Sequence, residues 1–113
     1  MSYKEKFSET RNNLRNLRKT IPDTFGGFVS LEQAASPDGA LSHKQKELIA
    51  LGIAVALRCE DCITSHVGAC IRAGVTREEA AEALGTAIQM SGGPGLMYAA
   101  KALAAFDEFA SET

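Results

Sequence analysis

Apolar residues along the chain recur with the period of an α-helix, and no stretch alternates between apolar and polar residues as a strand would. About residues 2–20 carry an apolar stripe on an otherwise charged surface, and a weaker helical pattern follows over about 24–35. The stripe consists of Tyr3, Phe7, Leu14, Leu17 and Ile21. SPDG at 36–39 then predicts a turn. The pattern as a whole predicts an all-α fold.

Short sequence signals mark the later helix boundaries. Ser42 followed by Gln45, and Thr76 followed by Glu79, have the spacing of a capping box, in which each side chain bonds the backbone of the other residue. We therefore expect helices to begin after Ser42 and after Thr76, the second running to about residue 90. The glycine-rich SGGPG at 91–95 should break the chain before a last helix.

The longest apolar run, Leu48 to Leu57, is apolar on every face of the helix that it predicts. Ten residues are too few to span a bilayer. We expect this helix to be buried on all sides, and in so small a chain such burial usually needs a partner subunit. The run therefore predicts a homo-oligomer.

Length and composition narrow the class of protein. A chain of 113 residues predicts one domain. With 23% charged residues and a net charge of −2, it offers no reason to expect nucleic acid or an anionic membrane as a partner. The opening MSYKEKFSET lacks the apolar segment of a secretory signal, so we expect a cytoplasmic protein.

The segment CEDCITSH at 59–66 holds two cysteines three apart and a histidine four positions further on. It could form a disulfide staple, a metal site or a redox pair that cycles between dithiol and disulfide. In a reducing cytoplasm, C-x-x-C more often indicates metal or redox chemistry. The odd count of three cysteines also fits poorly with a pure disulfide framework.

The segment 42–72 contains no proline and could form one long helix. In that helix Glu47, which should point inward, would lie about 28 Å from His66 at ~1.5 Å per residue. If the chain instead folds back near Arg58 to Glu60, two antiparallel helices bring Glu47 beside His66. Arg58 suits a helix C-terminus and Glu60 a helix N-terminus. We therefore predict a helical hairpin.

In the hairpin, Cys59 and Cys62 lie at the start of a helix, with Cα atoms roughly 5 to 6 Å apart, a separation that a disulfide tolerates. The exposed N–H groups there favour thiolate. His66 lies one turn beyond Cys62 on the same face and can take its proton directly or through a water. Glu47 would orient the imidazole, as a third group does behind a nucleophile and its base. This set of groups suits attack on a peroxide or a disulfide.

Zinc is the main alternative for these residues. Cys59 and Cys70 would lie about 16 Å apart along one helix, so they cannot share a tetrahedral ion. A three-ligand site of Cys59, Cys62 and His66 stays open. Cys70 is expected to be a small buried hydrophobe, and His43, at an exposed helix start, is expected to be inert.

Glu47, eleven intervening residues, Cys59-x-x-Cys62, three more residues and His66 together resemble the signature of AhpD-like alkylhydroperoxidases, in the carboxymuconolactone decarboxylase superfamily. The similarity covers about residues 41–110. This resemblance implies an AhpD-like helical bundle of about six helices, in which a hairpin carries the C-x-x-C motif.

The resemblance also bears on domains and assembly. It implies a single domain over 1–113, with 1–40 as an N-terminal helical extension and 41–110 as the core. Small members of the family typically assemble as trimers or hexamers. No cofactor and no metal are implied.

By resemblance, Cys62 is the nucleophile, Cys59 is the resolving thiol, and His66 with Glu47 forms a proton relay. Asp61 stands where the peroxidase has a second histidine, and a carboxylate beside a thiol disfavours thiolate. The implied function is a thiol-dependent antioxidant oxidoreductase that reduces hydroperoxides or disulfides through a Cys59–Cys62 cycle and takes electrons from a thiol donor. A decarboxylase-like enzyme and a non-enzymatic redox-sensing or metal-binding oligomer are the alternatives, although the decarboxylases of the superfamily lack the cysteine pair.

Overall fold

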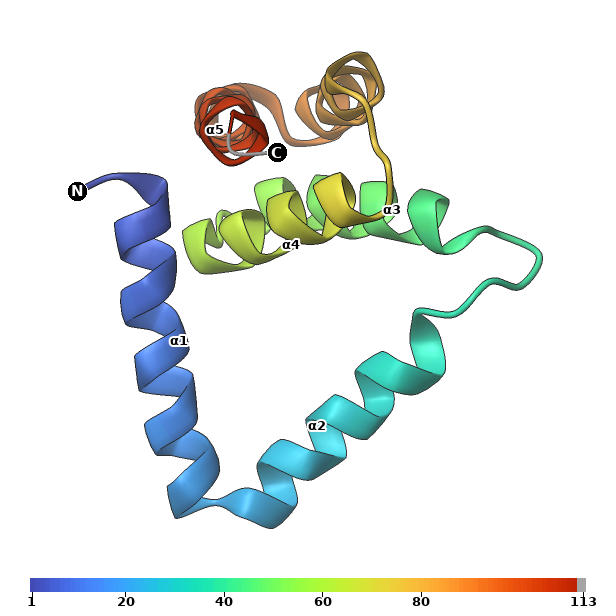
Figure 1. Ribbon diagram of the computed structural model, residues 1–113. Coiled ribbons are helices and arrows are strands. Elements are labelled where there is room, and N and C mark those ends of the chain that lie inside the picture. The colour runs from blue at the N-terminus through green and yellow to red at the C-terminus, as the bar shows by residue number, and fades with distance from the viewer. Residues whose placement is uncertain (112–113) are drawn as a thin grey trace.

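The computed structural model describes residues 1–111, and within that range every regular element is an α-helix (Figure 1). The five helices are α1 (Tyr3–Thr20), α2 (Pro22–Ala35), α3 (His43–Ala56), α4 (Glu60–Arg72) and α5 (Arg77–Ala110). The all-α prediction is confirmed. None of the helices in this range is long and apolar enough to cross a membrane.

The longest helix, α5, is broken within SGGPG. Gly92 has φ 68° and ψ −146°, a conformation that glycine adopts without the steric cost borne by other residues. Helical segments continue on both sides of this residue. Counted as two segments, α5 brings the total to six, in agreement with the number of about six that the family resemblance implied.

The predicted helix starts are correct. Ser42 caps α3 in a capping box with Gln45, whose backbone N–H donates to the Ser42 hydroxyl at 3.0 Å. Thr76 and Glu79 form the same box at the start of α5. Such a cap typically contributes about 1 kcal/mol, because it satisfies backbone N–H groups that the helix itself leaves unpaired. These local contacts explain why the boundaries could be read from the sequence.

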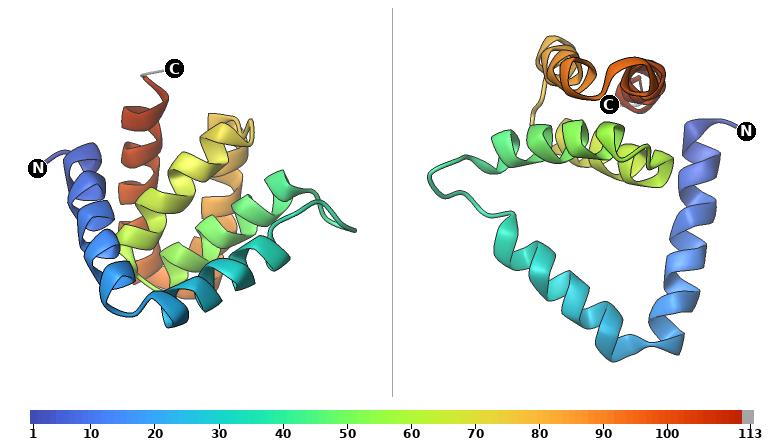
Figure 2. Two further views of the ribbon diagram at one scale, coloured as in Figure 1. Left: turned by 60° about the horizontal axis from the view of Figure 1, so that its bottom comes forward. Right: turned by 180° about the vertical axis from the view of Figure 1, so that it is seen from behind.

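The hydrophobic core lies between the α3–α4 hairpin and α5. α3 and α4 run side by side in one layer, and the two segments of α5 cover one face of that layer (Figures 1 and 2). The largest fully buried side chains all come from the hairpin: Leu51, Val55, Ile63, Thr64, Val67 and Cys70. Burying an aliphatic side chain of this size contributes about 1.5–3 kcal/mol, so this core holds the hairpin in place.

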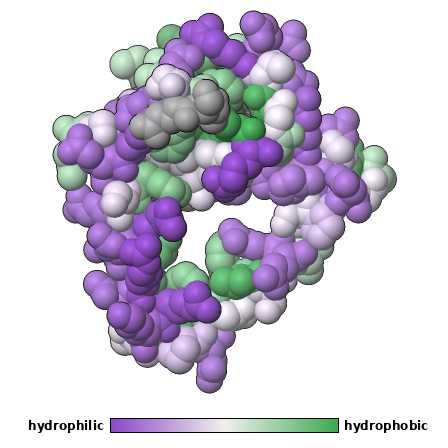
Figure 3. Space-filling model, in the orientation of Figure 1, coloured by the Kyte–Doolittle hydropathy of each residue, from purple (hydrophilic) through white to green (hydrophobic). Residues whose placement is uncertain are grey.

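The helices α1 and α2 form an arm that stands away from this core. α1 packs against α4 and α5, whereas α2, among the described helices, packs only against α1. No residue of these two helices is buried. The start of α1 is held by the Glu108 carboxylate, which accepts backbone hydrogen bonds from Tyr3 and Lys4. Figure 3 shows an open space between the arm and the core.

Within one chain the apolar helix α3 is buried over only part of its surface, and the burial on all sides expected from the sequence needs a partner subunit. Leu51 and Val55 face the core, but Ile49, Ile53 and Leu57 remain 49%, 54% and 70% exposed. The reason is geometric, because α4 and α5 cover only part of the α3 surface within one chain. A contiguous apolar strip therefore faces outward.

Candidate functional site

The α3–α4 connection is a tight reversal, which confirms the predicted hairpin. Leu57 caps α3, Arg58 takes a left-handed conformation with φ 58°, and Cys59 caps α4. The backbone N–H of Cys59 returns to the carbonyl of Ala54 at 3.1 Å. Positive φ is uncommon outside glycine, and here a single such residue turns the chain back.

The two motif cysteines lie together at the start of α4. Cys59 is the N-cap residue and Cys62 lies in the first turn, with Cα atoms 5.2 Å apart and the sulfurs joined in a disulfide. The Cys59 sulfur also accepts the Cys62 backbone N–H at 3.2 Å. When the pair is reduced, the same N–H groups and the positive end of the helix favour a thiolate here.

The acidic residues between these cysteines are engaged by neighbouring helices. The Glu60 carboxylate accepts from Lys6 at 2.9 Å and from Lys101 at 3.4 Å. The hydrogen bond from Lys6 is the main reason that the pKa of Glu60 lies below its usual value. The Asp61 carboxylate accepts a hydrogen bond from the Thr10 hydroxyl at 2.8 Å. Both carboxylates are therefore directed toward partners on other helices, and they tie α1 to the start of α4.

Glu47 and His66 meet across the hairpin. The Glu47 Oε2 atom lies 2.9 Å from His66 Nδ1, and Glu47 is 8% exposed. Because a carboxylate only accepts hydrogen bonds, Nδ1 carries the proton and Nε2 is left as the basic nitrogen. Burial between two helices fixes the carboxylate, and the carboxylate in turn fixes the ring.

A second histidine, His43, reaches the same carboxylate. Its Nε2 atom lies 3.9 Å from Glu47 Oε1, and its Nδ1 donates to the Ser36 carbonyl at 2.8 Å. From its place at the helix start, His43 was predicted to be exposed and inert, and its side chain is 44% exposed. The contact between His43 and Glu47 could have been predicted from their spacing, because His43 precedes Glu47 by four residues and so lies on the same face of the helix.

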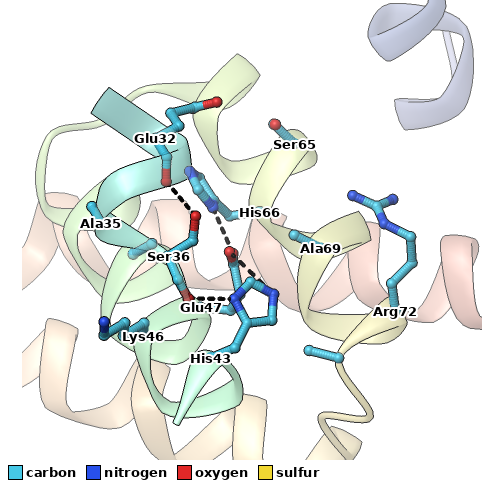
Figure 4. A pocket seen from close by; sticks show the side chains of 12 residues that line it. Glu32, Ala35, Ser36, His43, Lys46, Glu47, Ser65, His66, Ala69 and Arg72 are labelled. Atoms are coloured by element: carbon cyan, nitrogen blue, oxygen red, sulfur yellow. Dashed lines mark hydrogen bonds and ion pairs between the residues drawn. The ribbon is translucent and has the colours of Figure 1, made fainter. Parts of the chain in front are cut away.

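These three side chains line a cavity of about 460 Å³ between the end of α2 and the α3–α4 hairpin (Figure 4). Lys46 and Arg72 also line it, so acid–base groups and cations share one space. The remaining lining residues are Glu32, Ala35, Ser36, Ala50, Ser65, Ala69 and Ala73. Its size is within the range of small-molecule sites.

The four predicted site residues thus form two pairs. Cys59 lies with Cys62, and Glu47 lies with His66. No hydrogen bond joins Cys62 to His66 among the described residues, and neither motif cysteine lines the cavity described above. Cys62 and His66 connect the two pairs. They lie four positions apart on α4, a spacing at which Cβ atoms are about 5–6 Å from each other.

Cys70 lies apart from the motif pair and is a free, fully buried thiol. Its sulfur lies 3.5 Å from the Glu47 carbonyl oxygen, to which it donates. Burial raises the pKa of Cys70 to about 12, with a smaller contribution from the Glu47 charge. Over residues 1–111, no group of three or more His, Cys, Asp or Glu side chains is placed to hold a metal ion.

One known protein family matches most of this chain. The sequence profile of the carboxymuconolactone decarboxylase family matches residues 22–105. A solved structure of a protein of that family from Legionella pneumophila is 48% identical, with a TM-score of 0.92, and the match covers 95% of this chain and 96% of that one.

Two further proteins are similar over most of their length. A carboxymuconolactone decarboxylase family protein of Thermotoga maritima, for which a role in the antioxidative response has been suggested, is 31% identical with a TM-score of 0.83. That match covers 94% of this chain and 91% of the other. An uncharacterized protein of Cupriavidus necator is 41% identical over 104 residues, 92% of each chain.

Proposed function

The chain belongs to the carboxymuconolactone decarboxylase family, and we propose that within it the protein is a thiol-dependent oxidoreductase that reduces a hydroperoxide or a disulfide through Cys59 and Cys62. One observation carries the proposal. A C-x-x-C pair occupies the first turn of α4, and an imidazole held by a buried carboxylate follows one turn later. The antioxidative role suggested for the similar Thermotoga maritima protein supports the same proposed function.

The proposed cycle starts from the reduced pair. The Cys62 thiolate attacks one oxygen of a hydroperoxide, the O–O bond breaks, and the alcohol leaves after taking a proton. Cys62 is then a sulfenic acid, which the Cys59 thiolate attacks; the S–O bond breaks, the hydroxyl takes a proton and leaves as water, and the disulfide forms. A small dithiol donor returns two electrons and two protons through thiol–disulfide exchange. With a disulfide substrate, the first step forms a mixed disulfide instead.

His66 and Glu47 act as the proton relay in this cycle. The free Nε2 of His66 takes the Cys62 proton directly or through a water, and Glu47 stabilises the imidazolium that forms. The 2.9 Å contact between Glu47 and His66 Nδ1 supports this assignment, because it sets the tautomer that leaves Nε2 unprotonated.

A second candidate is a decarboxylase-like enzyme that uses the cavity without cysteine chemistry. The observation that favours it is the lining of that cavity, where His43, Glu47 and His66 meet the cations Lys46 and Arg72. Such a set can move a proton on an anionic substrate while the cations hold its charge.

Steady-state assays distinguish the two candidates. We expect turnover with a panel of hydroperoxides and small disulfides when a dithiol donor is supplied. Cys62→Ser should abolish it, because the hydroxyl cannot replace the thiolate as nucleophile. Cys70→Ser is the matched control and should keep full activity. Activity on a carboxylated lactone that survives Cys62→Ser would instead establish the second candidate.

The exposed strip of α3 leads to a proposal about assembly. A groove of about 410 Å³ runs along it, lined almost wholly by apolar side chains: Leu48, Ile49, Gly52, Ile53, Ala56, Ala83, Thr86, Ala87 and Met90. An apolar surface of this kind is typical of an interface between proteins. We expect a homo-oligomer, a trimer or a hexamer, that buries it.

Light scattering checks the assembly. The mass should be a multiple of 12.0 kDa, and Ile53→Glu should lower it by placing a charge in the interface. Leu41→Glu alters a side chain of similar exposure outside this groove and should leave the mass unchanged. A monomeric wild-type protein at micromolar concentration would contradict the proposal.

A further inference from the structure

A second groove, of about 390 Å³, lies between α1 and the C-terminal half of α4, on a different side of α4 from the cavity with Glu47 and His66. Its lining includes four basic side chains, Lys4, Arg11, Arg15 and Arg72, and no Asp or Glu from the part of the chain that the structure describes. The chain as a whole has a net charge of −2, so this concentration of positive charge is local.

The three arginines of the groove have no ionic partner among the described residues. Arg11 lies over the Phe7 ring at 5.9 Å, and Arg15 donates to the neutral amide of Asn12 at 2.6 Å. The Arg72 side chain makes no hydrogen bond, ion pair or ring contact within residues 1–111, and in Figure 4 it points away from the Glu47–His66 pair. Lys4 differs, because the Glu108 carboxylate interacts with it.

Without a bound anion, the arginines of this groove repel one another. Arg11 and Arg15 are four residues apart on one face of α1, where like charges destabilise a helix by a few tenths of a kcal/mol. Guanidinium groups bind carboxylate or phosphate through paired N–H donors. An oxyanion placed between α1 and α4 would relieve the repulsion and would give Arg72 a partner.

The floor of the groove is apolar. Phe7 and Phe109 meet edge to face with ring centroids 6.1 Å apart, and Ile71 lies beside them. Gly68 leaves the floor open between Phe109 and Arg72, since a Cβ atom there would come within 3.2 Å of the Arg72 guanidinium and 3.9 Å of the Phe109 ring. An apolar chain can therefore lie on the floor while its charged end reaches the arginines.

We propose that this groove binds an amphipathic anion, in which a carboxylate or phosphate head group contacts Arg11, Arg15 and Arg72 and a single apolar tail packs on Phe7 and Phe109. The proposal goes beyond the dithiol chemistry and does not depend on it. Arg72 lines both the groove and the cavity, so an anion bound to it in the groove would also reduce the positive charge at the edge of the cavity.

Titration calorimetry on the full chain, below the micelle concentration of each probe, tests the proposal. Decanoate and decyl phosphate carry the same tail on different head groups, and the tighter of the two identifies the head group that the site prefers. Hexanoate should bind more weakly than decanoate, because each buried CH₂ tightens Kd by up to about fourfold. Decyltrimethylammonium, with the opposite charge, should not bind.

Substitutions then locate the site. Arg72→Gln and Arg11→Gln should each weaken binding of decanoate about tenfold, the effect of losing one charged hydrogen bond. Lys19→Gln removes a charge of the same sign from the same helix outside the groove and should leave Kd unchanged. Gly68→Leu should fill the floor and remove the dependence on tail length while the charges remain, with its helix content checked by circular dichroism.

Several results would overturn the proposal. Failure of both decyl anions to bind would show that the groove is closed in solution or serves another purpose. Equal binding of the decyl cation would show adsorption to apolar surface rather than recognition of charge. Equal loss of affinity in Lys19→Gln and Arg72→Gln would show an effect of overall charge alone.

Discussion

Oxidation of the Cys59→Ser variant with one equivalent of an accepted hydroperoxide should leave Cys62 as a sulfenic acid or, when a small thiol is present, as a mixed disulfide. The wild-type protein should instead form the Cys59–Cys62 disulfide, two hydrogens lighter than the dithiol. The reason is positional, because the Cα atoms of the pair are 5.2 Å apart and the resolving thiol is already in reach of the oxidised one. Intact-mass measurement and peptide mapping distinguish these products.

Cys70 provides an internal control for this experiment. Its thiol is fully buried and its pKa is raised to about 12, so it stays protonated and unreactive near neutral pH. We expect iodoacetamide to modify the reduced motif cysteines in the native protein and to reach Cys70 only after unfolding. Cys70→Ser should cycle normally. A disulfide that maps to Cys70, or stoichiometric zinc that blocks oxidation, would exclude the proposed cycle.

Alkylation of Cys62 near neutral pH should slow about tenfold in His66→Ala. Removing the base leaves the thiol with a higher pKa, and a rise of one unit lowers the thiolate fraction about tenfold at a pH below both values. Glu47→Gln should have a smaller effect of a few fold, because the amide oxygen can still accept from His66 Nδ1 while the negative charge beside the ring is lost. The pH dependence of iodoacetamide modification reports both the rate and the thiol pKa.

His43→Ala is the matched control for the relay. His43 is also an imidazole beside the Glu47 carboxylate, but at 3.9 Å and without the one-turn register with Cys62. Its removal should leave the alkylation rate within about twofold of the wild type, because the bond between Glu47 and His66 Nδ1 is retained. Unchanged kinetics in both His66→Ala and Glu47→Gln would remove the relay from the mechanism.

The helix starts and the face of each helix that a residue occupies could be predicted from the sequence, because the interactions that set them join residues close together in the chain. Capping boxes at Ser42 and Thr76 join residues three apart, and the helical period joins residues three and four apart, so both are visible along the chain. The hairpin followed from one longer-range argument. Glu47 stands just ahead of the apolar run and should point inward, and a chain that folds back after the run brings it beside His66, whereas one continuous helix would hold the two about 28 Å apart.

Tertiary structure decided what depends on distant segments meeting. His43 contacts Glu47 as its register allows, but only the return of the chain to Ser36 places its ring at the cavity. The outward strip of α3 reflects how much surface α4 and α5 can cover, which no local pattern reports. Arg11 and Arg72 are far apart in sequence and share a groove only because α1 packs against α4. Helix starts and the C-x-x-C–His register were determined by the sequence, because short-range bonds set them; the placement of the arm, and the two cavities on either side of α4, were decided by packing.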